Sequence, residues 1–107
     1  MTLRRGEIYW ADLPQPRGRR PVLVLTRTRA ISSLTSVVVA PITTTVHRIA
    51  SQLPLGVEEG LPQPSVANCD NLHSVEKTLI DQRRVGRISP PKVRELDAAL
   101  RFALQIR

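Results

Sequence analysis

Basic and hydroxyl side chains adjoin the two most apolar segments of the chain. A basic turn at 17–21 precedes the apolar run 22–25, and the apolar run 37–40 leads into Pro41-Ile42 and three threonines at 43–45. A guanidinium presents a planar fork of N–H donors that matches a phosphate, and threonine hydroxyls can donate beside it. If the two apolar runs are paired strands, the guanidinium of Arg20 and the hydroxyl of Thr43 converge on one phosphodiester.

Such a pair suits phosphoryl transfer without a metal. In RNA the 2′-OH attacks its own phosphorus, so the protein must orient that hydroxyl, stabilise the charge on the phosphorus oxygens and help the 5′ oxygen leave. DNA lacks the 2′-OH and would stay intact. Each signal is weak by itself, because an arginine at a strand start is often simply solvated and threonine is common at sheet edges.

Other chemistries have less support. The possible metal ligands His47, Cys69, Asp70 and His73 lack the spacing of a zinc site. Glycine is sparse and forms no phosphate-binding loop. Cys69 is expected to be a buried thiol rather than a nucleophile. The sequence therefore predicts neither a metal nor a cofactor.

The charge distribution favours a polyanionic partner. The formal net charge is +7, and residues 1–50 carry eight basic and two acidic side chains, against eight and seven in residues 51–107. Fourteen of the sixteen basic residues are arginine, which a GC-rich genome also favours, but genome composition does not explain the excess in the first half. One cysteine, no apolar stretch near ~20 residues and no apolar leader predict a soluble cytoplasmic protein, without a membrane span, that folds as one domain over residues 1–107.

Hydrophobic patterning predicts many short strands and one terminal helix. The runs at 22–25 and 37–40 read as central strands because they are continuously apolar and β-branched. The other predicted strands cover 7–13, a weak edge strand at 49–57 interrupted by Pro54, 65–69, 72–75, 78–80 and 84–88, with one helical turn near 30–31. From Ser89 onward the apolar period becomes helical, with Asp97 and Arg101 as an outward i,i+4 pair. This pattern predicts a mainly β fold, a small barrel of short antiparallel strands with a C-terminal helix.

Several of these segments together resemble one family. The matching stretches are Gly6-Glu7-Ile8-Tyr9-Trp10, Gly18-Arg19-Arg20-Pro21-Val22-Leu23-Val24-Leu25, Val39-Ala40-Pro41-Ile42-Thr43 and Asp70-Asn71-Leu72, followed by a Leu/Ala-rich helix. In order and spacing they are similar to the MazF/PemK family, the toxins of type II toxin–antitoxin pairs. The resemblance implies an SH3-like barrel of the CcdB/MazF type and a homodimer. It also implies metal-independent, sequence-specific cleavage of single-stranded RNA to 2′,3′-cyclic phosphate and 5′-hydroxyl ends, and neutralisation by a small acidic antitoxin.

The resemblance also assigns roles to individual residues. Arg20 and Thr43 match the family's catalytic arginine and threonine, and Asn71 falls where many members place a glutamine that touches substrate. Further RNA contacts are expected from neighbouring basic and hydroxyl residues, namely Arg17, Arg19, Arg27, Thr44 and Thr45. Many members carry Glu-Gln-Gly before the Arg-Pro pair, whereas this chain has no acid between Asp12 and Arg20. His47 is also expected among the residues that contact the RNA, and it either replaces that glutamate as a base or is an exposed loop histidine.

Two other functions fit the same composition. One is a non-enzymatic topoisomerase poison of the CcdB kind, which needs an aromatic residue presented near the C-terminus. Phe102 falls within the helical period and is expected to be packed instead. The other is a plain nucleic-acid-binding barrel, for which three aromatic residues offer few platforms for base stacking.

Overall fold

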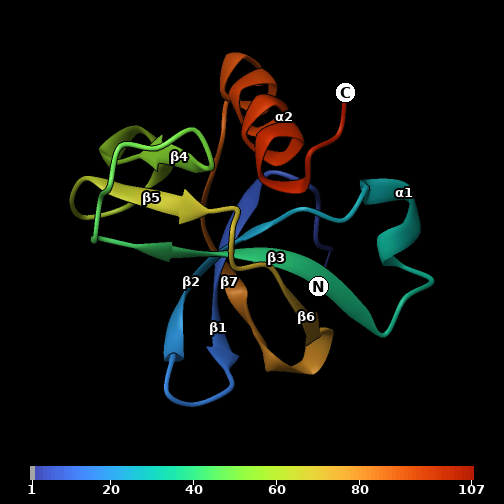
Figure 1. Ribbon diagram of the computed structural model, residues 1–107. Helices are drawn as coiled ribbons and strands as arrows, with labels where there is room; N and C mark the ends of the chain where they lie inside the picture. Colours follow the sequence, from blue (N-terminus) through green and yellow to red (C-terminus); the bar gives the residue numbers. More distant parts are fainter. Residues whose placement is uncertain (1) are drawn as a thin grey trace.

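The computed structural model describes residues 2–107 and shows a barrel-like arrangement of strands with a C-terminal helix (Figure 1). The strands are β1 (Glu7–Leu13), β2 (Gly18–Val24), β3 (Ser36–Thr43), β4 (Gln52–Leu55), β5 (Ser65–Asn68), β6 (His73–Glu76) and β7 (Ile80–Arg87). The helices are α1 (Thr28–Ile31) and α2 (Pro90–Leu104), and two short 3-10 turns cover Val57–Glu59 and Lys77–Leu79. Within residues 2–107 no helix has the length and apolarity needed to cross a bilayer.

All strand pairings are antiparallel. The sheet runs in the order β4-β5-β3-β2-β1-β7, and β6 pairs with the first half of β3 while β5 pairs with its end. Helix α2 packs against β4, and Figure 1 shows it lying across one end of the strands. The predicted mainly β fold with a C-terminal helix is therefore confirmed.

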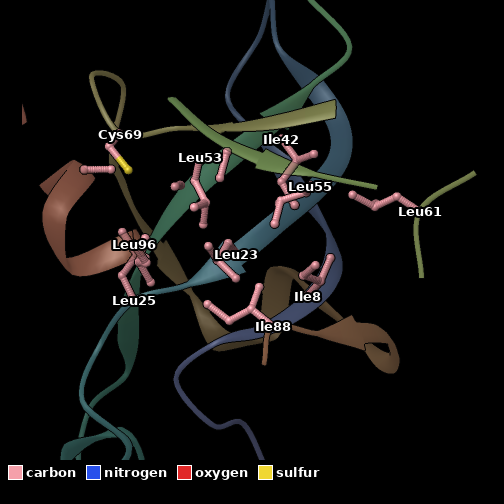
Figure 2. Close-up of a cluster of buried hydrophobic side chains, with 13 residues drawn as sticks. Ile8, Leu23, Leu25, Ile42, Leu53, Leu55, Leu61, Cys69, Ile88 and Leu96 are labelled. Atoms are coloured by element: carbon pink, nitrogen blue, oxygen red, sulfur yellow. The ribbon is translucent and has the colours of Figure 1, made fainter. Parts of the chain in front are cut away.

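The apolar run at 22–25 is continuous because β2 is covered on both faces there, whereas in the run at 37–40 of β3 the residue Val38 is 39% exposed. In β2, Val22 and Val24 belong to one buried cluster, whereas Leu23 belongs to a second cluster on the opposite face. Figure 2 shows this second cluster, in which Leu23 lies near Leu53 and near Leu96 of α2. A strand buried on both sides has no polar face, which explains the absence of alternation.

Several element boundaries differ from the sequence-based predictions. Strand β2 begins at Gly18, so Arg20 lies inside the strand rather than in a turn before it. The segment expected as two strands at 78–80 and 84–88 forms the single strand β7, whose pairing with β1 shifts register twice. Because the pairing is irregular and one face of β7 is exposed, apolar and polar residues do not alternate regularly along this strand. Strand β4 is shorter than predicted, but it is an edge strand, as Pro54 indicated.

Two expectations for helix α2 are wrong. Asp97 pairs with Arg5, with 2.9 Å between the guanidinium and carboxylate, rather than with Arg101. Because Arg5 also donates to the carbonyl of Leu25, this ion pair ties α2 to the barrel. Phe102 is 64% exposed rather than packed, since the buried face of the helix is formed by Leu96 and Ala99.

A buried carboxylate links β1 to β7. Glu7 accepts a hydrogen bond from the Tyr9 hydroxyl at 2.9 Å and pairs with Arg84 at 3.0 Å. Burial, together with the Glu7 carboxylate, raises the pKa of Tyr9 to about 12. This network holds Glu7 and Tyr9, the residues on either side of Ile8 in β1, and links them to Arg84 in β7.

Candidate active site

Strand register brings Arg20 and Thr43 together. In the β2–β3 ladder Val22 pairs with Pro41 and Leu23 with Ala40. Continuing this antiparallel register by two residues sets Arg20 opposite Thr43, and directly opposed residues point to the same face of a sheet. Both residues line one cavity of about 420 Å³.

The cavity is also lined by residues from strands β4 and β5 and from three loops. Of the residues predicted to contact substrate, Arg17, Thr45, His47 and Asn71 line it. Gln52 at the start of β4 and Asn68 at the end of β5 also line it, and the sequence analysis did not identify them. Their positions depend on the β4–β5 pairing, in which Gln52 lies opposite Asn68.

The guanidinium of Arg20 is held by a hydrogen bond and is not neutralised by any carboxylate among residues 2–107. Its terminal nitrogen donates to the carbonyl oxygen of Arg17 at 3.2 Å, and its Nε is buried without a hydrogen-bond partner in the described part of the chain. In residues 2–107 neither Arg20 nor Arg17 forms an ion pair. A buried donor without a partner is costly, so this arrangement favours an incoming anion.

The hydroxyl of Thr43 is oriented by the chain that follows it. Its Oγ1 accepts a hydrogen bond from the backbone N–H of Thr45 at 3.1 Å. Because that bond uses a lone pair of the oxygen, the hydroxyl hydrogen remains available for donation into the cavity. Arg20 and Thr43 can thus both donate to one oxygen-rich group between them.

Two of the residues predicted to contact RNA line a second hollow instead of this cavity, and a third lines neither of the two hollows. Arg19 and Thr44 line a neighbouring hollow of about 380 Å³, which also includes Arg20 and Thr43. Arg19 is paired with Asp81 at 2.7 Å and lies 3.6 Å from Asp12. Arg27 is exposed just before α1 and lines neither hollow.

His73 lies close to the site, although the sequence analysis considered it only as a metal ligand. It pairs with Val39, so its side chain points to the same face of β3 as Thr43. Its Nε2 is buried without a hydrogen-bond partner. Burial and then the charges of Arg17 and Arg20 lower the pKa of His73 below its ordinary value. The signal available in the sequence was its position two residues after Asn71 on a predicted strand.

This lowered pKa predicts a pH-dependent stability. Between the lowered folded-state pKa of His73 and the ordinary value of 6.5, the unfolded chain binds the proton more tightly than the folded chain. Stability should therefore fall as the pH is lowered from about 6.5. Urea unfolding at several pH values should show a shallower fall for His73→Gln than for the wild type. The exposed His47→Gln variant is the control, and equal slopes in all three proteins would contradict the prediction.

Cys69 is buried at 1% exposure, as predicted, and burial raises the pKa of its thiol to about 11. Within residues 2–107, no group of three or more His, Cys, Asp or Glu side chains is placed to hold a metal ion.

Fold and cavity together define a small basic β-barrel with an open polar site, and comparison with known proteins identifies its family. The family described as PemK-like, MazF-like toxin of type II toxin–antitoxin system matches residues 4–104. A Mycobacterium tuberculosis protein named probable endoribonuclease MazF2 is 40% identical over 100 residues, which cover 92% of this chain and 95% of that protein. The chain therefore belongs to the PemK-like, MazF-like toxin family.

Solved structures agree with this assignment. The Mycobacterium tuberculosis toxin MazF-mt6 superposes with a TM-score of 0.87 at 37% identity, covering 94% of this chain and 98% of that one. A mycobacterial endoribonuclease solved in complex with its cognate antitoxin superposes with a TM-score of 0.86 at 26% identity, covering 98% and 97%. The resemblance drawn from the sequence motifs is confirmed.

Proposed function

We propose that this protein is an endoribonuclease toxin that cleaves single-stranded RNA at short sequences without a metal. The observation that carries the proposal is that Arg20 and Thr43 both line one cavity, whose arginines form no ion pair within residues 2–107. Relatives of this chain are named endoribonucleases, which supports the same activity. The 2′-OH of the substrate supplies the nucleophile, so the protein needs no activated water.

In the proposed reaction the 2′ oxygen attacks the adjacent phosphorus and the bond from phosphorus to the 5′ oxygen breaks. Arg20 and Thr43 donate hydrogen bonds to the phosphorus oxygens, on which negative charge grows in the transition state. The departing 5′ oxygen takes up a proton from solvent, so the products are a 2′,3′-cyclic phosphate and a 5′-hydroxyl. Of the side chains lining the cavity, the imidazole of His47 is the one that can accept the proton of the 2′-OH, and solvent is the alternative acceptor.

The test is cleavage of a mixed-sequence RNA by the purified protein in the presence of EDTA. New 5′ ends should accept phosphate from a polynucleotide kinase without prior phosphatase treatment, because they carry a hydroxyl. Ends that require the phosphatase would contradict attack by the 2′-OH. Cleavage that appears only after a divalent cation is added would contradict metal independence.

We further propose that an acidic antitoxin segment binds the same cavity. Arg17 and Arg20, which form no ion pair within residues 2–107, can attract carboxylates for the same reason that they can attract phosphates. A mycobacterial endoribonuclease solved in complex with its cognate antitoxin shares this fold. An acidic peptide from the cognate antitoxin is expected to displace labelled RNA, and both affinities should fall as salt rises. Simultaneous binding of peptide and RNA in a fluorescence-anisotropy titration would contradict a shared site.

The active form of the protein is proposed to be a homodimer, and light scattering, which measures the molar mass in solution, tests this.

One observation favours the alternative function as a topoisomerase poison, because Phe102 is exposed near the C-terminus. A supercoiling assay with purified gyrase separates this alternative from the proposed ribonuclease. We expect no inhibition of gyrase at concentrations that cleave RNA.

A further inference from the structure

A half-buried histidine, His73, lies beside the proposed site and has no part in the proposed reaction. It lies opposite Val39 in the β3–β6 ladder, and Val39 lies opposite Val24 in the β2–β3 ladder. Because alternate residues of a strand share a face, Arg20 points to the same face of the sheet as Val24 and His73. The imidazole and the guanidinium therefore lie on one face of three neighbouring strands.

The same two side chains contain unsatisfied polar atoms. Among residues 2–107, the buried side-chain nitrogen and oxygen atoms without a hydrogen-bond partner are Nε of Arg20 and Nε2 of His73. Such atoms are uncommon and costly, so two of them on one face indicate a site that a bound group completes. His73 does not line the cavity, although Asn71, two residues earlier, does. It can therefore influence a bound group through its charge rather than through contact.

Two guanidinium groups are the charges that act on this imidazole. Burial, and after it the charges of Arg17 and Arg20, lower the pKa of His73 below its ordinary value. The other elements packed against it add no charge on this face. Strand β3 has no ionisable side chain, Tyr9 of β1 keeps its proton because its pKa is about 12, and Glu76 of β6 points to the opposite face.

The carboxylates of the neighbouring strands and turns are engaged by other side chains. The pairs are Asp12 and Asp81 with Arg19, Glu7 with Arg84, and Asp70 with the hydroxyl of Ser51. None of these carboxylates is among the groups that shift the pKa of His73. In the described part of the chain, the protein thus places three basic groups together and supplies no carboxylate to balance them.

We propose that His73 couples the binding of an RNA phosphate to the uptake of a proton. A phosphate held by Arg17 and Arg20 offsets their charges, so these charges no longer disfavour the protonated imidazole. Protonated His73 then supplies a third positive charge near the bound anion and strengthens its binding. The inference rests on the proposed function in one respect, because it takes RNA as the anion.

The direction of the pH dependence follows from linkage. The pKa of His73 lies below 6.5 in the free protein and should rise when a phosphate binds. Between these two values binding takes up a proton, so the affinity for RNA increases as the pH falls. Well above both values His73 is neutral in the free and the bound protein, and its titration no longer affects the affinity.

The first test uses a mixed-sequence, single-stranded 2′-fluoro oligonucleotide, which lacks the attacking hydroxyl and is not cleaved. Its affinity, measured by fluorescence anisotropy at constant ionic strength, should rise roughly 3- to 10-fold from about pH 7.5 to about pH 5.5, because a pKa that rises by about one on binding allows at most a tenfold gain. Calorimetry near pH 6 in buffers of different ionisation enthalpy should show proton uptake. Equal affinities at both pH values, or binding without proton uptake, would overturn the proposal.

Substitutions identify the group that takes up the proton. His73→Gln cannot be charged and should bind with the affinity of the wild type at high pH, whatever the pH. His73→Arg carries a fixed charge and should bind with the higher affinity throughout. His47→Gln removes the other histidine of the chain and should retain the pH dependence, whatever its affinity. A dependence that persists in His73→Gln and is lost in His47→Gln would overturn the proposal.

Nuclear magnetic resonance measures the same coupling in the wild type. Because the chain has two histidines, the titration of each imidazole can be followed separately. The pKa of His73 should rise when the 2′-fluoro oligonucleotide is added. It should also rise in free Arg17→Ala, because one of the two positive charges is removed. A pKa of His73 that stays the same when the oligonucleotide binds would overturn the proposal.

These outcomes are distinct from failure of the proposed function. Proton uptake by His73 in a protein that binds RNA but does not cleave it would support the coupling and refute the ribonuclease. Cleavage of RNA by a protein that binds the 2′-fluoro oligonucleotide without taking up a proton would refute the coupling and leave the ribonuclease standing.

Discussion

Replacing Arg20 by alanine is expected to lower the rate of RNA cleavage by about 10²- to 10³-fold, the usual effect of removing one donor to a developing oxyanion. The folded protein should persist, because within residues 2–107 the Arg20 side chain forms no ion pair and makes one hydrogen bond, to the carbonyl of Arg17. Arg20→Lys keeps the charge but loses the planar fork, so it should recover only part of the rate. The measurement is a single-turnover cleavage assay, with circular dichroism to confirm folding.

Arg29→Ala is the matched control for the Arg20 substitution. Arg29 is exposed on α1 and lines neither hollow, so its replacement removes the same charge at a distance from the site. It should change the rate of RNA cleavage by less than about threefold, because it weakens only the general electrostatic attraction between protein and RNA. Equal losses in Arg20→Ala and Arg29→Ala would show that net charge, rather than a positioned donor, accounts for the activity.

The largest effect on stability is expected at Gly86 in β7. A methyl group there would overlap the carbonyl oxygen of Glu59, and one at Gly60 would overlap that of Val85. The 3-10 turn at Val57–Glu59 and strand β7 thus approach so closely that only hydrogen fits between them. Gly86→Ala should destabilise the protein by about 4 kcal/mol or more, because the clash is with backbone that cannot move aside cheaply.

Gly56→Ala is the matched control for Gly86→Ala. A methyl group at Gly56 meets nothing within 4 Å, and its φ of −171° is extended backbone that any residue adopts. It should change the free energy of unfolding by less than about 1 kcal/mol. Urea unfolding and the soluble yield measure both variants. Similar midpoints for the two proteins would refute the close approach of Gly86 to Glu59.

The centre of the site could be predicted from the sequence because it depends on two adjacent strands. The apolar runs after Arg20 and before Thr43 identify buried strands, and neighbouring strands in the chain usually pair. Once they pair, the register places the two polar ends together. The family motifs lie in the same segments, which is why pattern and resemblance agree.

The rest of the site depends on contacts between distant segments, which local patterns do not contain. Arg19 pairs with Asp81, sixty-two residues later. The basic residues next to Arg19 in the sequence therefore do not predict that its charge is neutralised. Gln52 reaches the cavity through the β4–β5 pairing, and His73 through its pairing with β3. The contact of Gly86 with the turn before Gly60 is also nonlocal. Phe102 has the period of a packed residue, but α2 buries only a narrow stripe.

A single 2′-deoxy substitution in the RNA tests the central claim most directly. Once one cleavage site has been mapped, an RNA is made in which only the nucleotide 5′ to the scissile phosphate lacks its 2′-OH. If Arg20 and Thr43 stabilise attack by that hydroxyl, the substituted RNA should bind with similar affinity but remain uncut at this position. Cleavage of the substituted RNA at the rate of the unmodified RNA would contradict the account.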